Sequence, residues 1–160
     1  MPFLLDLLRH GEALPATGSG GDAARQLSPL GERDVARVAE ELARLGRRPD
    51  RAFTSPFPRA RKTAAIVLTR LGGGLAPEDL RELVPDHGPG DVVEALAARR
   101  VSGHVLLVGH QPLLGQLAAH LTGGPEPPFP PGGLVRIAFA EDLAAGRGRI
   151  ETQLRPEHLP

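Results

Sequence analysis

The sequence predicts an α/β fold, a three-layer α/β/α sandwich built around a mostly parallel sheet. Short apolar segments typical of buried strands alternate with longer segments in which apolar residues recur at helical spacing. Parallel strands are joined by right-handed crossovers, so this alternation places helices on both faces of the sheet. The last two expected strands, 134–140 and 149–154, are joined by a short turn, which predicts an antiparallel margin.

The first apolar segment, residues 3–8, predicts a strand buried on both faces, because apolar residues run through it almost without a break. Asp6 is the charged residue in this strand. An unpaired buried carboxylate is costly, so we expect Asp6 either at the sheet edge or beside a basic partner. The next segment, residues 14–26, is rich in glycine and small residues and predicts a flexible loop.

Signals for helices and further strands follow in order. Ser28 and Pro29 are typical of an N-cap and a first helical residue, and the helix that they open is expected to end at Gly46. The remaining expected elements are a strand at 51–54, a helix at 58–71, a weak strand near 80–84, a helix at 91–99, a strand at 104–108 and a helix opened by Pro112.

Length and composition narrow the class of protein. The 160 residues predict one domain spanning residues 1–160. Lysine plus arginine equals aspartate plus glutamate, 19 of each, so no net charge favours nucleic acid or an anionic membrane as a partner. The apolar runs are far shorter than the ~20 residues of a membrane span, and the N-terminus does not resemble a signal peptide. We therefore expect a cytoplasmic protein.

Three polar segments follow three predicted parallel strands. Ligands of such sheets bind beyond the carboxyl ends of the strands, so these segments should meet at one edge. There they would bring together two arginines, two histidines and the N-termini of two helices, which is typical of a site for a phosphoryl group. The segments contain Arg9 and His10, then Ser55 to Arg59, and then Gly109 to Gln111, which includes His110.

Histidine adds chemistry that an anion site alone does not need. A neutral imidazole is a nucleophile near pH 7 and can form a covalent phosphohistidine. We expect His10 to be the nucleophile, with Gly11 bringing backbone close to the phosphate and His110 donating to a phosphate oxygen. Ser55 is expected to support its turn or to contact phosphate through its hydroxyl.

The segments LLRHGEA, TSPFPRARKTA and VGHQP resemble the three signature segments of the histidine phosphatase superfamily, whose fold is phosphoglycerate mutase-like. The short length, the segment LSPLGERDVARVAEEL and the ending ETQLRPEHLP are similar to SixA-type phosphohistidine phosphatases. The resemblance implies that His10 is phosphorylated, that Arg9 and Arg59 clamp the phosphate and that His110 completes the pocket. It also implies that the enzyme needs no metal or other cofactor.

The chain departs from the larger superfamily members at the general acid. Those members carry a glutamate in a longer insertion, whereas here the segment RELVPDHGPGD is compact. Glu82, Asp86 and His87 are the candidates for an acid. The leaving nitrogen of phosphohistidine is basic enough to be protonated before it departs, so a dedicated acid is less necessary than for an ester.

These features predict hydrolysis of phosphohistidine carried by a phosphotransfer protein. No lid-sized insertion is present, and the loop at 14–26 looks too short and polar to enclose a metabolite, so the site is expected to be shallow. Two alternatives stay open, a small-molecule phosphomonoesterase of the same superfamily and a non-catalytic phosphoprotein-binding domain. A metal-dependent hydrolase is disfavoured, since cysteine is absent and the histidines lack the short spacing of a zinc site.

Overall fold

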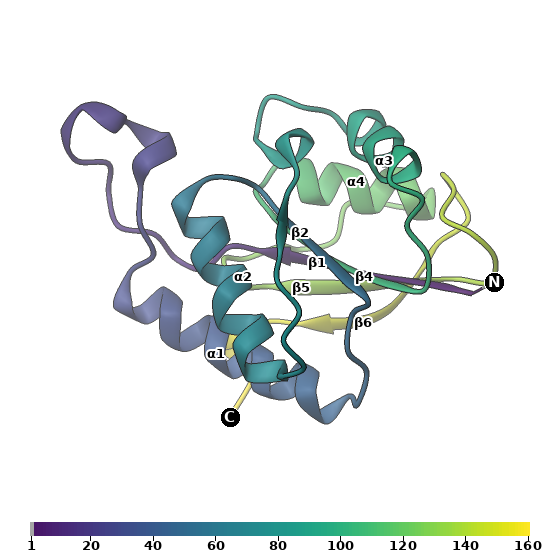
Figure 1. Ribbon diagram of the computed structural model, residues 1–160, viewed down its shortest axis with the longest axis horizontal. Coiled ribbons are helices and arrows are strands. Elements are labelled where there is room, and N and C mark those ends of the chain that lie inside the picture. The colour runs from purple at the N-terminus through teal and green to yellow at the C-terminus, as the bar shows by residue number, and fades with distance from the viewer. Residues whose placement is uncertain (1) are drawn as a thin grey trace.

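A computed structural model describes residues 2–160, which form a six-stranded sheet with helices on both faces (Figure 1). The strands lie in the order β3-β2-β4-β1-β5-β6. The first four in the chain pair in parallel, and β5 and β6 pair antiparallel at one margin, which confirms the predicted fold class. The strands are β1 (Phe3–Arg9), β2 (Arg51–Thr54), β3 (Glu78–Asp79), β4 (His104–Gly109), β5 (Leu134–Phe139) and β6 (Arg149–Leu154).

Four helices cover the sheet, two on each face (Figure 1). Helices α1 (Pro29–Arg44) and α2 (Pro58–Leu71) pack on one face, and α3 (Pro89–Ala98) and α4 (Leu113–Thr122) pack on the other. Successive side chains of β4 point to opposite faces: Val105 joins the apolar cluster under α3 and α4, and Leu106 joins the cluster under α1 and α2. Among residues 2–160, no helix combines the length and apolar character needed to cross a bilayer.

Most element boundaries agree with the local sequence signals. The Ser28 hydroxyl accepts the Gly31 N–H at 3.0 Å, so Ser28 caps α1 as predicted, with Pro29 at the first helical position. Helix α1 ends at Arg44, just before Gly46, which has a φ of 78°. Helix α2 and strands β2 and β6 have the predicted bounds.

The expected strand near 80–84 is wrong. Strand β3 contains only two residues, Glu78 and Asp79, and Arg81–Leu83 form a 3₁₀ helix. Leu80 and Leu83 are both fully buried, and their spacing of three fits the three-residue turn of a 3₁₀ helix, whereas a strand would place them on opposite faces.

Two helix starts also differ from expectation. Helix α3 begins at Pro89 instead of Asp91, because the Asp91 carboxylate accepts the Gly88 N–H at 3.0 Å and so belongs to the first turn. Helix α4 begins at Leu113, one residue after Pro112, and the Gln111–Pro112 peptide is cis.

Asp6 lies inside the sheet, since β1 is flanked by β4 and β5. Its side chain is only 3% exposed and accepts hydrogen bonds from Arg136 on β5 at 2.7 and 2.9 Å. His104 on β4 lies 2.7 Å from the same carboxylate. The expectation of a basic partner is therefore confirmed, and the alternative of a place at the sheet edge is wrong.

Burial alone would raise the pKa of the Asp6 carboxyl, but hydrogen bonds from Arg136 and His104 outweigh burial and hold that pKa below its ordinary value. A carboxyl whose pKa is lowered by folding contributes stability above its unfolded pKa, and this contribution is lost as pH falls through the folded pKa. The network therefore ties β4, β1 and β5 together at neutral pH.

Replacing Arg136 by Met should lower the free energy of unfolding at pH 7 by about 3–5 kcal/mol, because it leaves the Asp6 charge buried without its main partner. Urea denaturation measures the loss, and Arg149→Met, at an exposed position on the neighbouring strand, should stay within about 0.5 kcal/mol of wild type. An Arg136→Met variant as stable as wild type would contradict the role given to this ion pair.

Candidate active site

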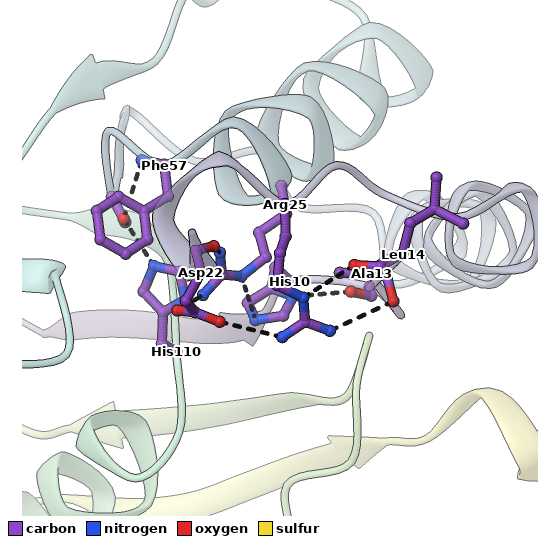
Figure 2. Close-up of polar contacts among 10 residues, drawn as sticks. His10, Ala13, Leu14, Asp22, Arg25, Phe57 and His110 are labelled. Atoms are coloured by element: carbon purple, nitrogen blue, oxygen red, sulfur yellow. Dashed lines mark hydrogen bonds and ion pairs between the residues drawn. The ribbon is translucent and has the colours of Figure 1, made fainter. Parts of the chain in front are cut away.

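The chain brings the predicted segments together at the carboxyl ends of β1, β2 and β4 (Figure 2). His10 follows β1, and its N–H donates to the carbonyl of Gly109 at the end of β4. His110 is the next residue, and the ring centroids of the two histidines are 5.0 Å apart. Arg59 reaches the same place from the first turn of α2, with its Nε 3.3 Å from His10 Nε2.

The contacts of His10 define which ring nitrogen carries its hydrogen. Nδ1 lies 2.7 Å from the Gly11 carbonyl oxygen, which can only accept, so Nδ1 holds the hydrogen and Nε2 presents a lone pair. Burial, together with the charges of Arg59, Arg9 and Arg25, lowers the pKa of His10 to about 4, although the Gly11 hydrogen bond opposes the shift. His10 is therefore a neutral imidazole at neutral pH, and its Nε2 accepts a hydrogen bond from Arg59 Nε at 3.3 Å.

Gly11 permits the close packing that fixes this geometry. A Cβ on Gly11 would lie 2.8 Å from the Gly31 carbonyl oxygen and 2.9 Å from Val35 Cγ2, so helix α1 leaves no room for a side chain. The N–H of Gly11 donates to Thr63 Oγ1 at 3.2 Å, and its carbonyl accepts from His10. The N–H and the carbonyl of Gly11 thus hold the turn in place. A direct contact between the Gly11 backbone and phosphate remains a prediction.

Thr63 is a supporting residue that the sequence did not reveal. Its hydroxyl donates to the Arg59 carbonyl at 2.8 Å while accepting the Gly11 N–H. It is fully buried in α2, one turn after Arg59. A threonine inside a helical pattern carries no sign of such a role, because the partner Gly11 is 52 residues away in the chain.

His110 is held by Ser55. Its Nε2 lies 2.7 Å from Ser55 Oγ, which also accepts the Phe57 N–H at 3.3 Å. The Ser55 hydroxyl can donate its hydrogen to His110 Nε2, and in that tautomer the imidazole hydrogen is on Nδ1. That Nδ1 is buried and has no hydrogen-bond partner within residues 2–160. Burial first, and then the charges of the neighbouring His10 and Arg59, lower the pKa of His110 to about 3.

Arg9 supplies a second fixed positive charge. Its Nη1 donates to the Phe129 carbonyl at 2.9 Å, and its buried Nε has no partner in the described part of the chain. Burial and the nearby charge of Arg59 lower the pKa of Arg9. Two guanidinium groups held in one partly desolvated place favour an anion between them.

The loop at 14–26 reaches the site and contributes two residues that the sequence did not single out. It contains two 3₁₀ helices, η1 (Gly18–Gly20) and η2 (Asp22–Ala24). Arg59 donates from Nη1 to the Asp22 carbonyl at 2.6 Å and from Nη2 to the Asp22 carboxylate at 3.0 Å. Arg25 donates to the other carboxylate oxygen at 3.2 Å and to the Leu14 carbonyl at 2.9 Å (Figure 2). No periodic pattern marks these contacts in the sequence.

The three acid candidates make no direct polar contact with this cluster among the described residues. None of the hydrogen bonds and ion pairs within residues 2–160 joins Glu82, Asp86 or His87 to Arg9, His10, Arg59 or His110. Glu82 and His87 instead line a separate cavity of about 370 Å³, and His87 Nδ1 lies 3.4 Å from the Asp91 carboxylate. Their role as a general acid remains a prediction without a supporting contact.

Possible metal ligands are also dispersed in the described part of the chain. Over residues 2–160, no group of three or more histidine, aspartate and glutamate side chains is placed to hold a metal ion.

Proteins of known structure share this architecture. The chain is similar to the protein histidine phosphatase SixA complexed with tungstate, with a TM-score of 0.84 and 29% identity over 96% of this chain and 97% of that one. A mycobacterial glucosyl-3-phosphoglycerate phosphatase has the same fold, with a TM-score of 0.70 and 20% identity over 94% of this chain and 98% of that one.

Sequence comparisons agree with the structural ones. The chain is 31% identical to the phosphohistidine phosphatase SixA of Escherichia coli over 156 residues, which cover 96% of this chain and 94% of that protein. Residues 5–84, which contain Arg9, His10 and Arg59, match the histidine phosphatase superfamily (branch 1). The chain therefore belongs to the histidine phosphatase superfamily.

Proposed function

We propose that this chain is a phosphohistidine phosphatase that hydrolyses protein-bound phosphohistidine through a covalent phosphohistidine on His10. The observation that carries the proposal is the state of His10, whose hydrogen is on Nδ1 and whose Nε2 lone pair faces Arg59 at 3.3 Å. A neutral imidazole in this arrangement is a nucleophile beside a group that binds phosphoryl oxygens. The 31% identity to phosphohistidine phosphatase SixA supports the choice of substrate.

The reaction would proceed in two steps. His10 Nε2 attacks phosphorus and forms a bond to it. The bond to the substrate nitrogen breaks with its electron pair passing to that nitrogen, and because the substrate ring is already protonated on its other nitrogen, it departs as neutral imidazole. Water then attacks the phosphorus on His10 and loses a proton to the solvent, and the bond from phosphorus to Nε2 breaks, which releases inorganic phosphate and neutral His10. Catalysis of such transfer is mostly positioning and stabilisation of the charge on the phosphoryl oxygens.

The remaining groups have separate roles in this proposal. Arg9 and Arg59 neutralise the phosphoryl oxygens, because a guanidinium can donate two parallel hydrogen bonds. His110 donates from Nδ1, the nitrogen that has no other partner among the described residues. Ser55 holds His110 in the required orientation through the 2.7 Å contact at Nε2.

Gly11 and Thr63 hold His10 and Arg59 at their relative positions.

The proposed partner is a phosphotransfer protein that carries phosphohistidine, met in the cytoplasm. Between α2 and β4 the chain contains only the short β3, one 3₁₀ helix and α3, which provide no large lid over the site. A site of this kind can admit a side chain that projects from another folded protein, with the surrounding surface adding recognition. We take residues 1–160 to act as one domain, since all six strands belong to one sheet.

A phosphotransfer domain that carries phosphohistidine should be hydrolysed with a kcat/KM roughly tenfold or more above that of any simple phosphomonoester. This ratio corresponds to a difference of about 1.4 kcal/mol in activation free energy. The physical reason is that a basic leaving nitrogen needs little help from a general acid, whereas an alkoxide does. Phosphate release from a panel of both substrate types measures the ratio. Faster turnover of a metabolite ester than of every phosphohistidine protein would replace this proposal with the small-molecule phosphatase.

The covalent intermediate should form on His10. Single turnover with labelled substrate, quenched in alkali to preserve phosphohistidine, should place the label on the peptide that contains this residue. His10→Asn should remove the label, while His120→Asn, at an exposed position on α4, should retain it. Label on His110, or no label on the enzyme, would contradict the assignment.

Replacing Arg9 or Arg59 by lysine should lower kcat by something on the order of 100-fold, as expected when a preorganised donor to the transition state is lost. Lysine keeps the charge but cannot donate the paired hydrogen bonds of the guanidinium. Steady-state kinetics separates this effect from binding, because a change confined to KM would show that the arginine only binds substrate. The control is Arg61→Lys, since Arg61 lies on the same helix but pairs with the exposed Asp79.

A further inference from the structure

Asp22 holds Arg59 in the manner expected of a phosphoryl group. The Arg59 Nη1 and Nη2 atoms donate to two oxygens of this one residue, the carbonyl at 2.6 Å and the carboxylate at 3.0 Å. A phosphoryl group would use the same guanidinium edge, because paired N–H groups match two oxygens of one anion. The Asp22 oxygens and a phosphoryl group therefore cannot bind Nη1 and Nη2 of Arg59 at the same time.

The two partners differ sharply in their surroundings. The Arg59 side chain is 4% exposed, whereas that of Asp22 is 63% exposed. The guanidinium is therefore fixed in the body of the protein, and the carboxylate approaches it from the solvent side. Breaking the contact requires movement of the loop and not of helix α2.

The loop that carries Asp22 is weakly tied to the rest of the protein. Every residue from 14 to 24 is exposed, so its movement uncovers little apolar surface. Gly18 and Gly21 have φ values of 76° and 62°, a region that other residues rarely adopt. Arg25 contacts both Asp22 and the Leu14 carbonyl, so it links the tip of the loop to its base.

We infer that Asp22 is a built-in competitor for the phosphoryl position, and that the loop at 14–26 must release Arg59 when a phosphoryl group binds. The inference rests on the proposed function, since it takes Arg59 as a phosphoryl ligand. Any phosphoryl group then binds with an affinity reduced by the fraction of molecules in which Asp22 occupies Arg59. Inorganic phosphate meets the same competitor, which favours release of the product.

Asp22→Asn removes the competing charge while keeping the size of the side chain. Isothermal titration with inorganic phosphate and with tungstate should give a Kd lowered roughly two- to fivefold, the range expected for loss of one partly exposed ion pair. The matched control is Asp79→Asn. Asp79 is also exposed and pairs with an α2 arginine, Arg61. Asp79→Asn therefore changes the net charge by the same amount as Asp22→Asn but leaves the contacts of Arg59 unchanged.

A second variant tests the loop without changing charge. Gly21→Ala meets no atom within 4 Å, so it acts only through its positive φ, which alanine disfavours. It should loosen the loop and lower the phosphate Kd in the same direction. Gly46→Ala is the control, because Gly46 also has a positive φ and open space but lies beyond the far end of α1. In wild type, phosphate should also shift the amide NMR signals of residues 18–24.

The outcomes separate this inference from the proposed function. If wild type hydrolyses phosphohistidine but Asp22→Asn and Gly21→Ala leave the Kd for phosphate unchanged or raise it, the competitor role is wrong. A fall in kcat of Asp22→Asn at unchanged Kd would likewise overturn it and give Asp22 a part in the reaction. If wild type neither binds phosphate nor hydrolyses phosphohistidine, the proposed function fails and this inference fails with it.

Discussion

The close contact between the turn after β1 and the start of α1 is the constraint on which the site depends. Glycine at position 11 lets the turn approach Gly31 and Val35, and a Cβ on Gly31 would lie only 2.2 Å from the Glu12 carbonyl oxygen. With no side chain on either partner, backbone groups are near enough to hold the side chains of the site directly. Gly11 binds His10 through its carbonyl and Thr63 through its N–H. His10 and the first turn of α2 are thereby fixed to one another.

The electrostatics of the site follow from how deeply these groups are placed. His10, Arg59 and His110 are all buried, so both imidazoles have lowered pKa values and are neutral at neutral pH. A neutral imidazole beside fixed cations suits a reaction in which an anionic group is transferred. The same cations attract a carboxylate of the protein itself, and Asp22 occupies that position from an exposed loop.

The sheet provides a rigid support for this arrangement. Asp6, Arg136 and His104 form a buried polar network across β5, β1 and β4, three residues before the β1 strand reaches Arg9. Strands β1 and β4 carry the two histidines just beyond their ends, so a fixed register between them fixes the distance between the rings. Burial of the network makes it costly to break by removing one partner. The network that stabilises the middle of the sheet therefore also fixes the strands that position the two histidines at its edge.

The sequence by itself determined the features that arise from neighbouring residues. Ser28 and Pro29 at the start of α1, the bounds of α2 and the antiparallel margin all follow from capping, helical periodicity and short turns. The meeting of Arg9, His10, Arg59 and His110 was also predictable, because parallel topology sends three strand ends to one edge.

Only the tertiary structure decided which partners those residues have. The hydrogen bonds of Thr63 to Gly11, of Ser55 to His110 and of Arg59 to Asp22 join residues 52, 55 and 37 positions apart. The same holds for residues 80–84, where burial of Leu80 and Leu83 favours a 3₁₀ helix over the predicted strand. Such contacts depend on how loops and helices pack in three dimensions, and local sequence patterns do not predict that packing.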